Sequence, residues 1–157
     1  MTDTPIAKIC GADVELGNFL IGPDGPAATP GRAAAALLDE MPGRPSNAFL
    51  LGRFDGDQQD VGRKFLPENG GCVYIDLNHL EICLPEVASA WDHLACWHAM
   101  LRLVRQAQDA ANSRLRDSRI QVLVNTSDGL GSSYGSHLDF LIARRTWDDM
   151  LDRKSVV

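Results

Sequence analysis

The sequence predicts an α+β domain in which helices pack on one face of a mainly antiparallel sheet. Several segments alternate apolar and polar residues, as half-buried strands do; one segment spaces its apolar residues as a helix does, and another has the start and stop signals of a short helix. The order along the chain is strand, helix, strand, helix, strand, strand, which fits this arrangement. A chain of 157 residues with 45% apolar and 23% charged residues also suits one globular domain.

The first strand is expected over residues 5–22, which alternate and are rich in β-branched side chains. Gly11 is the position in this strand where a bulge is expected. Pro23, Gly25 and Pro26 come directly after it and predict a loop.

A short helix is predicted after this loop. Thr29 is a suitable N-cap, Pro30 suits the first helical position, and Pro42-Gly43 would end the helix. Residues 43–71 hold eight glycines or prolines and several charges. We therefore expect a loop there, with a short extended piece at 47–54.

The middle of the chain contains the clearest helix. Residues 72–77 predict a strand, and residues 81–84 either continue it or form its neighbour. The helix is expected over about 86–115, where apolar residues recur at spacings of three and four. Its apolar face holds Leu94, Trp97, Leu101 and Val104, and its polar face holds Arg102, Arg105, Gln106 and Asp109.

Two more strands are expected, over 120–125 and 137–144, with a glycine-rich loop at 127–136 between them. The loop has no GK[ST], and it does not place GxGxxG between a strand and a helix, so it is not a phosphate-binding loop of those types. Ser132 and Ser133 also lack the GxSxG setting of a hydrolase nucleophile. The glycines are therefore expected to permit a tight connection.

The composition excludes several functional classes. The net charge of −6 argues against a nucleic-acid-binding surface. No apolar run approaches the roughly 20 residues that cross a bilayer, and the N-terminus lacks the pattern of a secretory signal. The four cysteines form no CxxC pair and lack the tight spacing of a structural zinc site. We expect a cytoplasmic protein with reduced thiols and without nucleic-acid or membrane partners.

Three predicted strands carry one polar and one apolar face, because alternate side chains of a strand share a face. The polar positions pair within each strand as Asp13 with Glu15, Tyr74 with Asp76, and His137 with Asp139. The side chains between or beside them are apolar and face the other way: Val14, Val73, Ile75, Leu138 and Phe140.

A polar sheet face is most often a solvated one, and for each single pair that interpretation stays open. A solvated face, however, collects Lys, Thr, Ser and Arg, whereas these positions hold carboxylates, a tyrosine and a histidine. Converging carboxylates repel one another unless a cation lies among them. Hard divalent ions such as Mg²⁺ take oxygen ligands, and two such ions about 4 Å apart can clamp phosphate oxygens. The residues therefore favour a metal–nucleotide site on the sheet face.

Four segments, in order, resemble the Pup–protein ligase and depupylase family, also known as proteasome accessory factors. The segments are 11–17, 68–86, 90–112 and 125–144. The most specific feature is D-x-x-H-x-E, from Asp76 to Glu81, combined with DGxGxSYGSH at 128–137. The family belongs to the carboxylate–amine ligase superfamily and is related to glutamine synthetase, which implies a glutamine-synthetase-like sheet.

The resemblance also implies an activity. Enzymes of this family bind ATP and magnesium on the concave face of an antiparallel sheet. The ligase phosphorylates the C-terminal glutamate of a small protein modifier and joins it to a substrate lysine. The depupylase cleaves that isopeptide bond and deamidates a C-terminal glutamine of the modifier. We therefore expect ATP and Mg²⁺ as cofactors, and a Pup-like modifier and its protein targets as partners in a proteasome pathway.

The resemblance assigns roles to individual residues by matching position. Asp76 takes the place of the catalytic aspartate, a base directed at the attacking lysine or at water, and Tyr74 lies beside it. The metal-binding positions would be Asp13, Glu15, Glu81 and Glu86. The other cofactor-binding positions would be Tyr74, Asn125, Asp128 and His137, with His137 at a metal or a phosphate.

The chain departs from the family pattern at several positions. Asp13 is shorter than the family's glutamate, Leu80 replaces the proline of HPE, Thr126 replaces the second asparagine of NN, and Leu138 replaces a glutamate. The short interval between the first carboxylates and the catalytic aspartate resembles the ligase, whereas D-x-x-H and DGxGxSYGSH resemble the depupylase. Ligase, depupylase and a divergent third branch therefore stay open.

Family members run to several hundred residues, so we expect residues 1–157 to be the N-terminal part of a carboxylate–amine ligase-like catalytic domain with an incomplete sheet. Three functions follow as alternatives. The first is an ATP- and Mg²⁺-dependent ligase or amidohydrolase acting on a C-terminal glutamate or glutamine tag. The second is a catalytically incomplete fragment or binding module that retains half of the site. The third is a carboxylate–amine ligase for a small amino acid or peptide.

Overall fold

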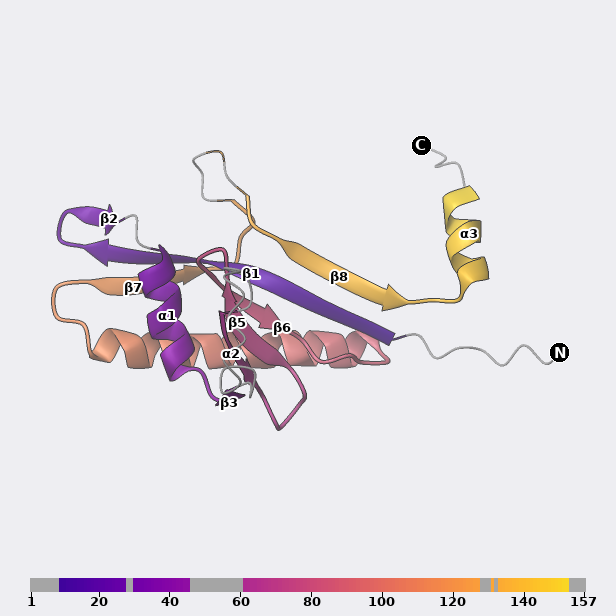
Figure 1. Ribbon diagram of the computed structural model, residues 1–157, viewed down its shortest axis with the longest axis horizontal. Coiled ribbons are helices and arrows are strands. Elements are labelled where there is room, and N and C mark those ends of the chain that lie inside the picture. Colours follow the sequence, from indigo (N-terminus) through magenta and orange to yellow (C-terminus); the bar gives the residue numbers. More distant parts are fainter. Residues whose placement is uncertain (1–8, 28–29, 46–60, 128–130, 132, 153–157) are drawn as a thin grey trace.

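The computed structural model of the protein describes residues 9–27, 30–45, 61–127, 131 and 133–152 (Figure 1). Within these residues the chain forms an eight-stranded antiparallel sheet and three helices. The strands are β1 (Ile9–Gly22), β2 (Gly25–Ala27), β3 (Arg44–Pro45), β4 (Val61–Phe65), β5 (Cys72–Asp76), β6 (His79–Cys83), β7 (Arg119–Leu123) and β8 (Ser136–Leu141). The helices are α1 (Pro30–Glu40), α2 (Ala90–Ser113) and α3 (Arg144–Asp152). The predicted α+β class and antiparallel sheet are confirmed.

The long strand β1 organises the sheet. The strand order is β2-β1-β6-β5-β4-β3, and β7 and β8 also pair with β1. The first half of β1 pairs with β8 over 9–14, its centre pairs with β6 over 13–16, and its second half pairs with β7 over 17–21. Strands β8, β6 and β7 therefore lie one after another along β1, with β6 at its centre.

Helices α1 and α2 cover one face of this sheet (Figure 1). The core between them is formed by Val14, Leu16, Val73, Leu80 and Ile82 from the strands, by Leu37 and Leu38 from α1, and by Met100, Val104 and Ala107 from α2. Because side chains alternate along a strand, the polar residues between these apolar ones emerge on the opposite face. Helix α3 follows β8 and lies away from α1 and α2 (Figure 1).

A buried asparagine connects three elements of the core. Asn18 is 1% exposed. Its Nδ2 donates to the carbonyl oxygens of Pro30, at 2.7 Å, and Asn78, at 3.2 Å, and its Oδ1 accepts from the backbone N–H of Leu80 at 3.0 Å. The side chain thus joins β1 to the start of α1 and to the β5–β6 turn, which satisfies backbone groups that helix ends and turns leave open.

The two main helices differ from their predicted limits in detail. Helix α1 begins at Pro30, as predicted, while the expected N-cap Thr29 lies outside the described residues. Helix α2 begins after Ser89, whose Oγ accepts from the backbone N–H of Asp92 at 3.1 Å, rather than near Glu86. On α2, Val104 is buried as predicted, but Leu94 is 45% exposed, because α2 reaches the core mainly from Met100 onward.

The prediction of a loop over 43–71 is wrong in part. The short strands β3 and β4 lie within it and pair with each other, and β4 extends the sheet beside β5. Gly62 has a φ of +73°, and the β4–β5 register shifts between Val61 and Lys64. This irregular, glycine-containing edge shows no strand pattern in the sequence. Its strand conformation is stabilised by pairing with β5, which a local pattern does not reveal. The extended piece expected at 47–54 lies outside the described residues.

Other predictions are corrected at the two ends of the described chain. The register between β1 and β8 runs without a break past Gly11, so no bulge is present there. Residues 25–27 form β2 rather than a loop, joined to β1 by a two-residue turn at Pro23-Asp24. Helix α3 was not predicted; it begins at Arg144, where the last strand was expected to end.

The apolar side of β8 is not covered as expected. Leu138 is 55% exposed and Phe140 is 60% exposed. These two side chains and residues at the start of α2 line a hollow of about 290 Å³. None of the described helices is both long and apolar enough to cross a membrane.

Candidate functional site

The register of β1, β6 and β5 places three polar side chains in one row across the sheet. Glu15 is opposite Glu81, and Glu81 is opposite Tyr74 on its other side. Residues 81–84 had been predicted either to continue the preceding strand or to pair with it, and the pairing is the observed outcome. The turn at Leu77 and Asn78 makes this possible, since both residues have positive φ, 43° and 74°, as in a tight two-residue hairpin.

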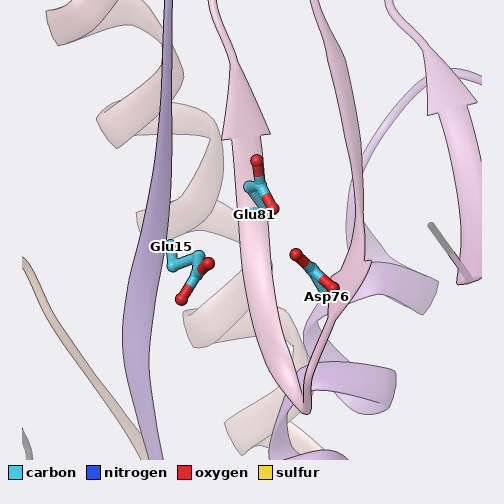
Figure 2. Close-up of side chains that lie close together, drawn as sticks. All are labelled: Glu15, Asp76 and Glu81. Carbon is cyan, nitrogen blue, oxygen red and sulfur yellow. The ribbon is translucent and has the colours of Figure 1, made fainter. Parts of the chain in front are cut away.

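Three carboxylates converge at this row. Ligand oxygens of Glu15, Asp76 and Glu81 all lie within 4.8 Å of one another. Figure 2 shows them on neighbouring strands, with the helices behind the sheet. Among the residues that the structure describes, this is the one group of three or more His, Cys, Asp or Glu side chains so close together. The polar sheet face predicted from strand alternation therefore exists, with Glu81 as its centre.

Glu81 is the most deeply buried member of the group, at 4% exposed. Burial raises the pKa of its carboxyl group; the hydrogen bond from Tyr74 lowers that pKa, and the nearby Asp13, Asp76 and Glu15 raise it further. The Tyr74 hydroxyl donates to Glu81 Oε1 at 2.7 Å. Burial, followed by this hydrogen bond, raises the pKa of Tyr74, so the phenol keeps its proton and remains a donor.

The donor set fits a hard divalent cation. All three side chains offer carboxylate oxygens, and Asp76 Oδ1 is buried without a hydrogen-bond partner. A buried carboxylate oxygen is normally hydrogen-bonded or coordinated to a metal. Magnesium takes oxygen ligands at about 2.0–2.1 Å, so oxygens on opposite sides of one ion lie about 4 Å apart, close to the spacing seen here.

Strand β8 brings the last motif against the carboxylates. His137 Nδ1 lies 2.6 Å from Asp13 Oδ1, and this hydrogen bond, together with the charge of Asp13, raises the pKa of His137. The backbone N–H of Gly135 donates to Glu15 Oε2 at 3.0 Å. A Cβ at Gly135 would lie 3.0 Å from the ring of His137 and 3.3 Å from Glu15, so the loop approaches closely because this residue is glycine.

Two of the predicted positions lie apart from this group. Glu86 is exposed and borders a separate hollow of about 390 Å³, together with Asp13 and Asp139. Asp13 thus lies between the carboxylate group and this hollow, and it is hydrogen-bonded to His137 on β8. Glu86 comes after the end of β6, so it lies beyond the strand that carries Glu81.

The loop residues predicted to bind cofactor are only partly described. Asp128 lies outside the described residues. Asn125 uses its side chain within the loop: its Nδ2 donates to the carbonyl oxygen of Ser127 at 2.6 Å, and its Oδ1 accepts from the hydroxyl of Tyr134. In the conformation seen here, the Asn125 amide therefore shapes the loop.

Sequence reasoning assigned no role to several residues around the site. Arg63, from the unpredicted strand β4, places its guanidinium carbon 4.1 Å from the ring centroid of Tyr74. His79 stacks on Tyr134 with ring centroids 4.5 Å apart, and its Nδ1 lies 3.0 Å from the carbonyl oxygen of Leu16. His79 and Tyr134 both belong to the quoted motifs, D-x-x-H and SYGSH, so their spacing was the available signal.

Comparison with known proteins identifies the family. The family model described as "Pup-ligase protein" matches residues 12–154. The chain belongs to the Pup-ligase protein family.

Curated members of the Pup-ligase protein family match most of this chain. It is 30% identical to the Pup deamidase/depupylase of Mycolicibacterium smegmatis, over 88% of this chain and 33% of the relative. It is 31% identical to the Pup–protein ligase of Kocuria rhizophila, over 88% of this chain and 28% of the relative. The chain therefore spans about a third or less of the length of these relatives, and both subtypes match about equally well.

A solved structure of the Pup-ligase protein family has the same fold. It is the crystal structure of the complex between the prokaryotic ubiquitin-like protein Pup and its ligase PafA, with a TM-score of 0.67 and 19% sequence identity. The match covers 88% of this chain and 26% of that chain. The predicted family and its glutamine-synthetase-like fold are thus confirmed, while the roles of individual residues stay predictions.

Proposed function

We propose that the polar face of the sheet binds a magnesium–nucleotide complex in the service of Pup ligase or depupylase chemistry. The observation that carries this proposal is the convergence of Glu15, Asp76 and Glu81 within 4.8 Å, with a buried oxygen of Asp76 that lacks a hydrogen-bond partner. A solvated face would not bury a carboxylate as deeply as Glu81, and a structural ion pair would place a cationic side chain among the three.

Each residue has a proposed part. Glu15 and Glu81 would hold Mg²⁺, and Tyr74 would keep Glu81 in place through its hydrogen bond. A bound Mg²⁺ would neutralise phosphate charge and orient the nucleotide. Asp76 would accept the proton of the attacking lysine or water.

The neighbouring residues would contact the nucleotide or assist the metals. His137, held by Asp13 and thereby favoured in its protonated form, would supply positive charge toward phosphate. Asn125 and Asp128 would act at the loop side, and Glu86 would assist from the second hollow. These assignments rest on matching positions within the family.

The substrate would be the C-terminal glutamate or glutamine of a Pup-like protein modifier, and the protein targets of that modifier would be further partners. The names of the two curated relatives support this substrate class, one as a ligase and one as a deamidase/depupylase. We also propose a cytoplasmic location within a proteasome pathway.

A second candidate function is a binding unit that holds the nucleotide or the modifier without turnover. The observation that favours it is the coverage, since the chain spans 33% and 28% of the two curated relatives. It uses the same carboxylates as the first candidate.

Calorimetry of ATP binding to this chain, with and without Mg²⁺, tests both candidates. We expect magnesium-dependent binding that Glu15→Gln and Glu81→Gln each abolish, whereas the exposed Glu68→Gln leaves it unchanged. Binding followed by ligation or deamidation of a Pup-like modifier supports the enzyme, and binding without turnover supports the binding unit. A folded chain that binds no ATP with Mg²⁺ contradicts the enzyme and a nucleotide-binding unit.

The role of Asp76 has its own test. Asp76→Asn keeps the shape of the side chain but cannot accept a proton at neutral pH. If Asp76 is the base, this variant should retain magnesium-dependent ATP binding and lose turnover by about 100-fold or more. Turnover by Asp76→Asn at the rate of the unaltered chain would show that another group is the base.

A further inference from the structure

Two cysteines face each other beside the carboxylate row. Cys72 on β5 is directly opposite Cys83 on β6, and Cys83 is directly opposite Asp13 on β1. This row of side chains lies next to the row formed by Tyr74, Glu81 and Glu15, two residues along each strand. The cysteines are thus neighbours of the candidate metal site, and no part of the proposed function uses them.

The spacing of the two cysteines suits a covalent link. Residues directly opposite in an antiparallel pair have Cα atoms about 4.5–5.5 Å apart and side chains on the same face. Disulfides join Cα atoms about 4.4–6.8 Å apart. The direct pairing of Cys72 with Cys83 therefore places their side chains within reach of a disulfide.

The surroundings of the two sulfurs are unequal. Arg63 Nη1 lies 3.0 Å from Cys72 Sγ, and a guanidinium beside a thiol favours the reactive thiolate. Cys83 Sγ is 3.7 Å from the hydroxyl oxygen of Tyr74, to which it can donate. Cys72 is buried at 7% exposed, whereas Cys83 is half-buried. Cys83 is therefore the more accessible of the two to a small oxidant.

We propose that Cys72 and Cys83 form a reversible, peroxide-driven disulfide across β5 and β6. In the first step, the Cys72 thiolate attacks one oxygen of hydrogen peroxide; the O–O bond breaks, Cys72 becomes a sulfenic acid, and the released hydroxide takes a proton to form water. In the second step, Cys83 attacks the sulfur of Cys72, the S–O bond breaks, and a second water leaves with the proton of Cys83. The two thiols lose two electrons in total, which the peroxide accepts.

The link would reach the candidate metal site through Tyr74. Once oxidised, Cys83 has no proton to donate to the Tyr74 oxygen, and Tyr74 is the residue that holds Glu81. The proposal does not depend on nucleotide binding, because it concerns the thiols alone and its test measures them directly.

The test exposes the full chain to hydrogen peroxide, quenches and denatures it in acid, and alkylates the remaining thiols. We expect the alkylatable cysteines to fall from four to two and a linked peptide pair to contain Cys72 and Cys83. Dithiothreitol should restore all four. The variant with Cys10→Ser and Cys96→Ser keeps the pair and should form the same link, while Cys83→Ser should accumulate higher oxidation at Cys72 without a link.

A second measurement tests whether Arg63 activates the Cys72 thiol, apart from the proximity of the two cysteines. Arg63→Gln should slow formation of the link several-fold, and Arg63→Lys should restore most of the rate, since the positive charge favours the Cys72 thiolate. The proposal is overturned if the double variant, shown to be folded by circular dichroism, retains both thiols at peroxide concentrations that oxidise Cys10 or Cys96 in the unaltered chain. Loss of both thiols without a linked peptide would overturn it equally.

Discussion

Glu81 lies at the centre of the candidate site, and its burial is unfavourable for the stability of the metal-free fold. Its carboxylate is 4% exposed and has three other carboxylates nearby, with Tyr74 as its hydrogen-bond donor. Burying such a charge without a cation is unfavourable, and perturbed carboxylates of this kind gather at functional sites. The local environment of Glu81 is therefore arranged for a bound cation more than for the stability of the metal-free fold.

The pH dependence of stability follows from the raised pKa of Glu81. A carboxyl group whose folded-state pKa lies above its unfolded value binds more protons when folded, so it adds stability at low pH and loses it as pH rises through the folded pKa. Without metal, we expect the free energy of unfolding to rise as the pH falls from 7 toward the ordinary value of 4.5. Glu81→Gln should weaken this trend and be more stable than the unaltered chain at pH 7.

Urea unfolding at several pH values, in the presence of a chelator, measures this effect. The exposed Glu68→Gln is the matched control and should keep the pH trend of the unaltered chain. If Glu81→Gln keeps the full trend, another carboxyl group dominates it.

Strand alternation identified part of the site at the residue scale. Asp13, Glu15, Tyr74 and Asp76 do share the polar face, because a period of two holds in any regular strand. The separation of Glu86 from the group was not predictable, since it depends on where β6 ends. Leu138 faces away from His137, as predicted. Its exposure was not predictable, because the sequence of one strand does not show which elements cover that face of the sheet.

At the scale of elements, the β5–β6 hairpin decides which residues meet. Its turn puts Leu77 and Asn78 at positive φ, and this sets Tyr74 opposite Glu81. Leucine is uncommon in that conformation, so local preferences did not indicate a two-residue turn. The element types of β1, β5, α2, β7 and β8 followed from residue pattern, and that of α1 from its start and stop residues. The edge strands β3 and β4 and the helix α3 did not.

Asn18 is the residue that ties these elements together, and its removal should be costly. Asn18→Ala would leave the N–H of Leu80 and the carbonyl oxygens of Pro30 and Asn78 without their partner. We expect a loss of about 2–3 kcal/mol in the free energy of unfolding, as for buried groups deprived of a hydrogen bond. Asn18→Asp should be destabilising as well, because a carboxylate accepts from Leu80 but cannot donate to the two carbonyls.

Chemical denaturation of both Asn18 variants provides the measurement. Gln106→Ala, at an exposed position of α2, is the control and should change stability by less than about 0.5 kcal/mol. Asn18 variants as stable as this control would show that the three backbone groups find other partners.

At the scale of the whole molecule, the sheet has two faces with different tasks. Helices α1 and α2 close one face into the core, and the other presents the carboxylates (Figures 1 and 2). Because Glu15, Asp76 and Glu81 come from β1, β5 and β6, a cation bound among them would join β1 to the β5–β6 hairpin, which is distant from it in sequence. Binding there should stabilise the whole sheet.

Magnesium should therefore raise the thermal stability of the chain. Binding to the folded state alone stabilises it by about 2.7 kcal/mol at a concentration 100-fold above Kd. We expect the melting temperature to rise with MgCl₂ and to remain unchanged with NaCl of equal ionic strength. Glu15→Gln should remove the magnesium effect while leaving a folded chain; a rise of equal size in this variant would place the ion elsewhere.

The central position of β1 has a consequence for how the protein is made. On the ribosome, β1 emerges before its partners, which apart from the short β2 follow only at residues 79–83, 119–123 and 136–141. During that interval β1, the longest of the described strands, has few partners of its own and could pair with neighbouring chains. Asp13 and Glu15 interrupt its apolar residues with like charges, which oppose such pairing. The carboxylates of the candidate site would thus protect the strand during synthesis, before any ligand can reach them.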